Sequence, residues 1–374
     1  MRQRAGLLLL LTVFAVVIGM VILRGRSPSN GAANGIDGSP SALTPNADPM
    51  TLKGYIGSEK AVFLKDPQVI QILRQKFGLT LEFDQRGSLD MVRDTHAAEK
   101  DFLWPSSQVA LELYKEQGGR PARADIIFNS PIVLYSWASV TEALIKAGVV
   151  RKEQQTYYVV DFPKLVKMIT AGKTWKDVGM PQLHGRILIY STDPTLSNSG
   201  TMFAGLLADV LNNGEAVSEA KLPAILPTLQ KFFESQGYME TRSDDNFQQF
   251  LNLGMGAKPI IIGYESQLLD YSLPNAAALA ARKEAVRILY PKPTVWSSHP
   301  LMALNDRAKR LNDALLDPEI QRIAWTKHGF RSASGAQNDP KLFQITGVAE
   351  TIENVVPMPS PRVTERILRA LGSK

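Results

Sequence analysis

The stretch RILIYSTDPTLSNSGTMF, residues 186–203, joins an apolar run to a hydroxyl-rich turn and then to a helical pattern. Arg186–Tyr190 reads as a buried strand, and the apolar residues after the turn recur at helical spacing. Hydroxyl groups at a helix start cap free backbone N–H groups, which also suit an anionic or polar ligand. We therefore expect ligand contacts from the end of this turn, at Ser197, Ser199, Gly200 and Thr201.

Two further turns have the same character, and each follows a predicted strand. Gly57-Ser58-Glu59-Lys60 comes after Leu52–Ile56, and Trp104-Pro105-Ser106-Ser107 comes after Asp101–Trp104. A third strand, Pro259–Gly263, ends at Tyr264-Glu265-Ser266. Helix capping without any ligand would also explain such hydroxyls. The additional candidate ligand-binding residues are Ser58, Lys60, Ser106, Ser107, Tyr264 and Glu265.

The alternation of predicted strands and helices from residue 51 onward indicates an α/β fold with a largely parallel sheet. In such sheets ligands bind beyond the carboxyl ends of the strands, where all of these turns fall. A carboxylate at Glu265 would oppose a multivalent anion and would suit an amine, a metal ion or a polyol hydroxyl. The sequence therefore leaves the identity of the ligand open.

No catalytic or metal site is predicted, and no cofactor is implied. The four histidines have neither HxH nor HxxxH spacing, and the chain has no cysteine. They are His96, His184, His299 and His328. The spacing of the residues assembles no nucleophile, base and orienting group, so we expect a binding protein rather than an enzyme.

The net charge of +6 over 374 residues does not indicate a nucleic-acid partner. Four of the 42 Lys and Arg residues flank an apolar run at the N-terminus, and the other 38 nearly balance 36 Asp and Glu residues. These four are Arg2, Arg4, Arg24 and Arg26. The length suits two domains, or one domain of two lobes, with a sizeable core.

Residues 5–23 form an uncharged, mostly apolar run that is long enough to cross a bilayer as a helix of roughly 28 Å. Because Arg24 follows directly and no small-residue cleavage site lies close by, we favour an uncleaved anchor over a cleaved signal. Residues 1–4 would be a cytoplasmic tail and 24–50 a flexible linker. The protein would then be a single-pass protein of the cell membrane with an extracytoplasmic domain.

Residues 51–335 resemble the type II periplasmic, or extracellular, solute-binding proteins, which are the receptor subunits of ABC importers. The resemblance rests on GYIGSEKAVFLKDPQV, FDQRGSLDM, DFLWPSS, ADIIFNSPIVLYSW and IIIGYESQLLDY, and above all on the segment that ends TDPTLSNSG. In relatives that bind oxyanions or metals, such a turn contributes to the ligand site. The fold accepts many ligands, so the resemblance names none.

The resemblance implies two α/β lobes joined by crossover strands, with a small polar solute bound between them. The first lobe would comprise 51–130 and 294–374, and the second 131–293. An ABC permease would be the partner. Such proteins are usually free or anchored through a cysteine, whereas this chain lacks cysteine and is expected to keep its helix. A sensor or scaffold that retains the fold, without transport, is the alternative.

Overall fold

Two sheets that share one long strand define the architecture of the computed structural model, which describes residues 48–333, 338–343, 345 and 347–372. The first lobe carries the order β2-β1-β3-β9-β4, with the short β10 also paired to β4. Its strands are β1 (Met50–Ile56), β2 (Leu79–Gln85), β3 (Phe102–Trp104), β4 (Arg123–Trp137), β9 (Trp296–Ala303) and β10 (Arg331–Ser332). The second lobe continues from β4 through β8 and β6 to β5, and β7 pairs with β4. Its own strands are β5 (Val150–Glu153), β6 (Tyr157–Asp161), β7 (Ile260–Tyr264) and β8 (Val286–Lys292).

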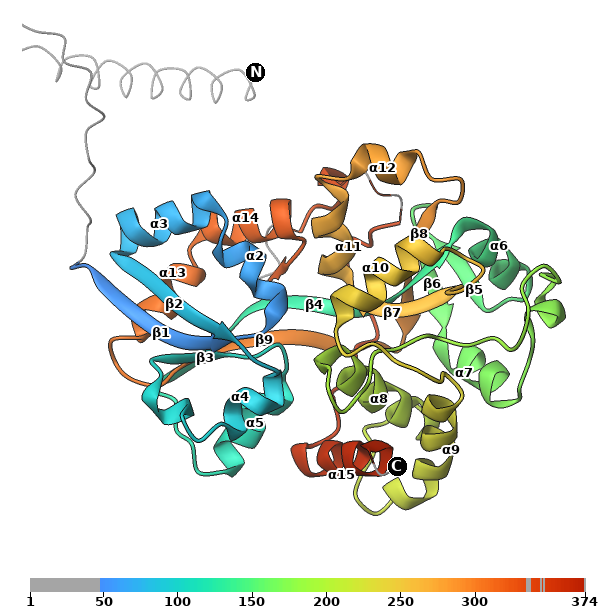
Figure 1. Cartoon of the computed structure of the whole chain (residues 1–374), viewed down its shortest axis with the longest axis horizontal. Helices are drawn as coiled ribbons and strands as arrows, with labels where there is room; N and C mark the ends of the chain where they lie inside the picture. The colour runs from blue at the N-terminus through green and yellow to red at the C-terminus, as the bar shows by residue number, and fades with distance from the viewer. Residues whose placement is uncertain (1–47, 334–337, 344, 346, 373–374) are drawn as a thin grey trace, which may run out of the picture. The chain divides into compact units, whose positions relative to one another are not determined.

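Helices cover both sheets (Figure 1). The first lobe has α2 (Ala61–Leu64), α3 (Pro67–Phe77), α4 (Ser88–Arg93), α5 (Gln108–Glu116), α13 (Lys309–Leu315) and α14 (Pro318–His328). The second lobe has α6 (Ala138–Lys146), α7 (Phe162–Thr170), α8 (Asn198–Leu211), α9 (Leu222–Glu234), α10 (Ser243–Leu253), α11 (Glu265–Ser272) and α12 (Ala276–Ala280). A last helix, α15 (Pro361–Gly372), lies beside α8 and α9.

The helix α3 shows how local chemistry sets an element's ends. The Asp66 side chain accepts a hydrogen bond from the backbone N–H of Gln68, and Pro67 occupies the first helical position. Gly78 ends the helix at φ +65°, a left-handed conformation that glycine adopts without a Cβ clash. These are the boundaries expected from the sequence, and the strands on either side of the helix are also present.

The two lobes are connected through β4. Residues Arg123–Pro131 of β4 pair with β9, whereas Ile132–Trp137 pair with β7 and β8. The chain returns to the first lobe after β8, through residues 293–295 and into β9. The chain crosses a third time between β10 in the first lobe and α15 on the second. The first two crossings lie near the middle of the molecule, which is where a two-lobed protein can bend.

The sheet differs from the largely parallel one expected. The pairs β1–β2, β1–β3 and β6–β8 are parallel, but every pairing that involves β4 or β9 is antiparallel. The predicted strand Arg186–Tyr190 forms only isolated bridges, at Arg186 with Thr174 and at Tyr190 with Ile261. It is buried through Ile187 and Ile189, so its apolar pattern reflects core packing rather than a continuous ladder.

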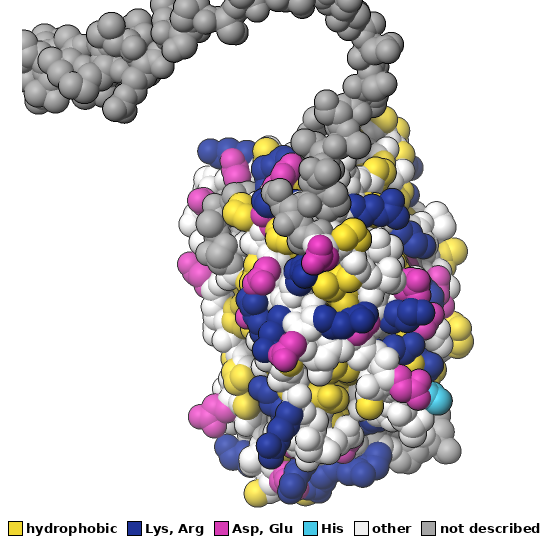
Figure 2. All heavy atoms as spheres, turned by 90° about the vertical axis from the view of Figure 1, so that its left-hand side faces the viewer, with side chains coloured by type: hydrophobic (Ala, Val, Ile, Leu, Met, Phe, Trp, Pro, Cys, Tyr) yellow, Lys and Arg dark blue, Asp and Glu magenta, His cyan; other side chains and the backbone are white. Residues whose placement is uncertain are grey.

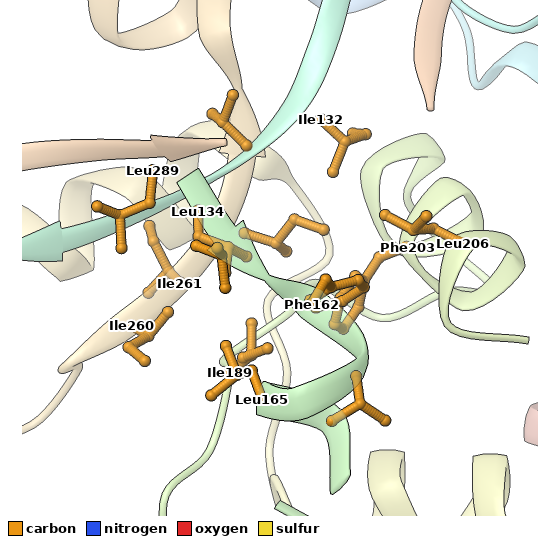
Figure 3. Packing of buried hydrophobic residues seen from close by; sticks show 14 of the residues in the cluster. Ile132, Leu134, Phe162, Leu165, Ile189, Phe203, Leu206, Ile260, Ile261 and Leu289 are labelled. Carbon is orange, nitrogen blue, oxygen red and sulfur yellow. The ribbon is translucent and has the colours of Figure 1, made fainter. Parts of the chain in front are cut away.

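The core of the second lobe is the larger of the two main clusters. Figure 3 shows Phe162, Phe203 and Ile261 among the side chains packed from β4, α7, α8 and β7. Val363 and Ile367 of α15 belong to the same cluster. The C-terminal helix therefore packs mainly on the second lobe, although Glu365 also pairs with Arg93 of the first lobe at 2.7 Å. The sequence assigned residues 294–374 to the first lobe.

The predicted anchor at residues 5–23 and most of the linker lie outside the described residues. Within the described ranges, no helix is both long enough and apolar enough to span a membrane. On the face of the first lobe shown in Figure 2, basic and acidic side chains are interspersed.

Candidate ligand-binding cleft

Two adjoining cavities lie between the lobes, where the carboxyl ends of β1, β3 and β7 meet the start of α8. We call the first the hydroxyl compartment; its volume is about 190 Å³. Its hydroxyl side chains come from Ser58, Ser88, Ser106, Ser197, Ser199, Thr241, Ser243 and Tyr264. We call the second the acidic-aromatic compartment; its volume is about 280 Å³. Ser58, Glu59, Ser243 and Tyr264 line both compartments.

A buried polar cluster forms the wall of the cleft on the first lobe. Lys60 is 0% exposed, and its Nζ donates to Ser106 Oγ at 2.8 Å and contacts the Glu59 carboxylate. The same nitrogen lies 3.3 Å from His299 Nδ1. A charge can stay buried here because it is paired and hydrogen-bonded.

The charges in this cluster follow from its burial. Burial disfavours the charged carboxylate of Glu59, but the Lys60 ammonium and the hydrogen bonds from Lys60 and Ser106 outweigh it and lower the pKa of Glu59 to about 2. Burial and the same ammonium lower the pKa of His299 to about 3, so its ring is neutral near pH 7. The cluster therefore presents one ionised carboxylate, at Glu59, to the cleft.

The second lobe contacts the first across the cleft through α8. Asn198 Nδ2 donates to the backbone carbonyl of Ser106 at 3.2 Å and to the Tyr264 hydroxyl at 3.0 Å. Ser297 Oγ donates to the same Ser106 carbonyl at 2.8 Å. The Ser106 turn is thus held from both sides, and the first turn of α8 reaches the opposite lobe.

Five of the ten residues predicted to bind ligand line the hydroxyl compartment. They are Ser58, Ser106, Ser197, Ser199 and Tyr264. The Ser197 and Ser199 hydroxyls lie 3.0 Å apart, and Ser197 makes no side-chain cap to the α8 backbone. The turn that opens α8 therefore presents hydroxyl groups to the cavity rather than only to its own helix.

The other five predicted residues do not line either compartment. Lys60 is buried behind Glu59, and the Ser107 hydroxyl caps α5 by accepting from the Val109 N–H at 3.2 Å. Thr201 is buried in α8, where its Oγ1 donates to the Pro194 carbonyl at 2.8 Å. Gly200 serves close packing, because a Cβ there would lie 2.5 Å from the Thr192 carbonyl oxygen.

Glu265 also has a structural place, away from the cleft. It is 0% exposed and forms an ion pair with Arg331, whose Nη2 donates to Glu265 Oε1 at 2.8 Å. The Tyr290 hydroxyl donates to the same carboxylate at 2.5 Å. Because Arg331 neutralises this carboxylate and Glu265 lines neither compartment, Glu265 gives no reason to exclude an anionic ligand, which the sequence had suggested.

Sequence reasoning missed several residues of the cleft. Glu59 and Asn198 lie inside turns that had been singled out, but neither was chosen as a candidate. Arg242, Asp244 and Phe247 come from the start of α10, which sequence reasoning did not single out. The run Ser243-Asp244-Asp245 at a helix start could have indicated a polar turn, but nothing in it places the turn opposite Glu59.

The charges on the rim of the hydroxyl compartment are largely balanced. Arg86 Nη2 lies 3.0 Å from Asp94 Oδ2, and Arg242 Nη2 lies 3.8 Å from Asp244 Oδ2. Among the described residues, no group of three or more His, Asp or Glu side chains could hold a metal ion. The compartment can therefore bind a solute chiefly through hydroxyl and amide hydrogen bonds.

The fold matches that of solved solute-binding proteins. Iron-bound HitA from Pseudomonas aeruginosa aligns at a TM-score of 0.57 and 13% identity, covering 87% of this chain and 100% of that one. The substrate binding protein of an ABC transporter from Agrobacterium tumefaciens aligns at 0.54 and 14%, covering 88% and 96%. A periplasmic thiamin binding protein aligns at 0.54 and 11%, covering 88% and 99%.

These similarities establish an α/β fold of the type II periplasmic-binding-protein class, as the sequence resemblance predicted. At identities of 10–14% they establish the fold and not the ligand. Neither a protein-family model nor a curated protein matches the sequence.

Proposed function

We propose that the protein is an extracytoplasmic solute-binding receptor that captures a small polar solute between its lobes and delivers it to an ABC importer. The observation that carries this proposal is the hydroxyl compartment, to which both lobes contribute hydroxyl groups around one cavity. Clefts between lobes are common binding sites for small ligands. The solved proteins with this fold named above, which include an iron-bound protein and a thiamin binding protein, support it.

The mechanism is closure of the lobes on the solute, without covalent chemistry. The strand β4 and residues 293–295 are two of the connections that would bend. On closure, Ser58 and Ser106 approach the solute from the first lobe, while Ser197 and Ser199 approach it from the second. The contact between Asn198 and the Ser106 carbonyl would stabilise the closed form.

The predicted N-terminal helix would keep this receptor at the membrane beside its permease. A linker of residues 24–50 spans roughly 25–30 Å as a coil, which lets a receptor reorient while its local concentration stays high. The alternative, a sensor or scaffold, shares the fold and the anchor and differs in the partner. Crosslinking in native membranes separates the two: an ABC permease supports the receptor, and a partner of another class supports the alternative.

Thermal unfolding of the full chain, titrated with a panel of metabolites and ions, tests solute binding itself. A solute at 100 times its dissociation constant should stabilise the protein by about 2.7 kcal/mol. The shift in unfolding temperature should disappear in Ser197→Ala, which loses a hydroxyl of the cleft, and should persist in Ser218→Ala, an exposed serine outside it. A shift that survives Ser197→Ala unchanged would place binding elsewhere.

A further inference from the structure

The acidic-aromatic compartment has a composition that the hydroxyl compartment lacks. Its lining includes three carboxylates, Glu59, Asp244 and Asp270, and none of the described residues that line it is Lys or Arg. Four aromatic side chains line it as well: Phe247, Tyr264, Tyr271 and Phe330. His328 also lines it and contacts Asp270 at 2.9 Å. A cavity with carboxylates and aromatic residues in its walls and no Lys or Arg in its own lining favours a positively charged organic group.

Two of the three carboxylates are already paired within the protein, Glu59 with Lys60 and Asp270 with His328. Glu59 is ionised, as described above, and its neutralising Lys60 is buried behind it. Asp244 Oδ1 accepts from the neutral amide of Gln267 at 2.9 Å, and it is half-exposed. Arg242 Nη2 is 3.8 Å from Asp244 Oδ2, beyond hydrogen-bond distance, so Asp244 can still accept a hydrogen bond from an ammonium group.

Gln267 positions the Asp244 carboxylate at the wall of the cavity. Its Nε2 donates to Asp244, and its buried Oε1 has no hydrogen-bond partner within the described part of the chain. This oxygen has no accessible surface, so the acceptor that a ligand can reach is the half-exposed Asp244 carboxylate. A primary or secondary ammonium can donate a hydrogen bond to that carboxylate and a quaternary one cannot, which favours the former.

The aromatic groups come from both lobes. Phe247 and Tyr271 pack edge to face, with ring centroids 5.4 Å apart, on the second lobe. Phe330 lies on the first lobe, where its other contacts include the buried ring of Phe128. The carbon body of a ligand could therefore be enclosed by rings as the lobes close.

We propose that the acidic-aromatic compartment binds the ammonium group of an organic amine, whose other polar groups extend past Glu59 and Tyr264 into the hydroxyl compartment. This inference rests on the proposed solute-binding function and narrows it to a class of solute. The two compartments share Ser58, Glu59, Ser243 and Tyr264, so one ligand can occupy both. Their combined volume accommodates a small amine with hydroxyl groups.

Isothermal titration of the full chain in non-ionic detergent, with matched pairs of ligands, tests the proposal. Each pair has an amine and its hydroxyl counterpart: ethanolamine and ethylene glycol, glucosamine and glucose, and phenethylamine and phenethyl alcohol. Sulfate and phosphate serve as anion probes. We expect at least one amine to bind at least tenfold more tightly than its hydroxyl counterpart, and neither anion to compete with it.

The variant Asp244→Asn removes the charge and keeps the side-chain size, and Asp245→Asn is its matched control outside the cavity lining. Amine affinity should fall at least tenfold in Asp244→Asn and stay within twofold in Asp245→Asn, while affinity for the hydroxyl counterparts is unchanged in both. Thermal unfolding without ligand checks that both variants fold.

Three outcomes would overturn the inference. Equal affinity for an amine and its hydroxyl counterpart, or tighter binding of sulfate or phosphate, would overturn it and leave the solute-binding function standing. An amine affinity that is unchanged in Asp244→Asn would do the same. If no probe binds, the inference fails, and the wider panel of metabolites and ions then decides whether the proposed function fails with it.

Discussion

Asn198, at the first turn of α8, donates a hydrogen bond across the cleft to the backbone carbonyl of Ser106, at 3.2 Å. Ser106 belongs to the first lobe and Asn198 to the second, so this contact exists only when the lobes are close. The same amide also donates to the Tyr264 hydroxyl, at the end of β7. One side chain thus joins both lobes at the edge of the cavity.

Replacing this side chain should shift the balance toward the open form. In Asn198→Ala we expect solute affinity to fall by about two- to twelvefold, because a net hydrogen bond is worth about 0.5–1.5 kcal/mol. Small-angle X-ray scattering should show a larger radius of gyration without ligand. An unchanged affinity together with an unchanged radius would mean that the contact does not govern closure.

The ion pair of Glu265 and Arg331 should be structural. Glu265→Ala leaves the guanidinium of a 3%-exposed Arg331 without its charge partner, and breaking a buried pair costs about 3–5 kcal/mol. Urea denaturation of the full chain measures this loss. The double variant Glu265→Gln/Arg331→Met should be less destabilised than Glu265→Ala. If Glu265→Ala is as stable as the parent protein but no longer binds solute, Glu265 contacts the ligand after all.

Asp209 should make stability depend on pH in the opposite sense to most carboxylates. It is buried in α8, and this burial raises its pKa to about 7, although its Oδ1 accepts from the Val217 N–H at 2.8 Å. The folded state therefore holds a proton that the unfolded state loses near pH 4, so this group costs stability as pH rises from about 4 to 7.

The isosteric Asp209→Asn should remove that cost. We expect a gain on the order of 1–3 kcal/mol in the free energy of unfolding at pH 7.5, and little gain at pH 4. Denaturant titrations at the two pH values measure it. Because asparagine retains the oxygen that accepts from Val217, the hydrogen bond is preserved. A variant that is less stable than the parent protein at pH 7.5 would show that the ionised Asp209 carboxylate does not cost the folded state stability.

Acid should destabilise the protein through the Lys60 cluster. His299 is held neutral with a pKa of about 3, while an unfolded histidine takes up a proton near pH 6.5. The unfolded state therefore binds more protons below about pH 6.5, and stability falls as pH drops toward 3. His299→Gln should flatten this part of the stability profile, and a profile that keeps its slope would assign the acid sensitivity to other groups.

Much of the fold could be predicted because local signals were strong. Asp66 begins α3 with a side-chain cap and Gly78 ends it with a left-handed turn. Both signals depend only on neighbouring residues. The predicted strand Arg186–Tyr190 was wrong as a continuous strand, since apolar periodicity reports burial and not hydrogen-bond partners. The lobe covered by α15 depends on tertiary packing, which no local pattern encodes.

The cleft was predicted only in part, for a related reason. Hydroxyl turns at strand ends identified Ser58, Ser106 and Ser197, because topology brings those ends together. The same rule could not separate Ser107, which caps its own helix, from Ser106, which lines the cavity. Asp244 and Phe247 were missed because they follow a loop rather than a strand, and only the folded chain places them opposite Glu59.

Native mass spectrometry of the full chain, released from detergent and purified without added solute, tests the central claim most directly. We predict a retained small mass on the parent protein that is lost from Ser197→Ala/Ser199→Ala, because that variant removes two hydroxyls of the compartment. The retained mass also identifies the class of solute. A retained mass that persists in the double variant would contradict binding in this cleft, as would a bare chain that no solute of the panel stabilises.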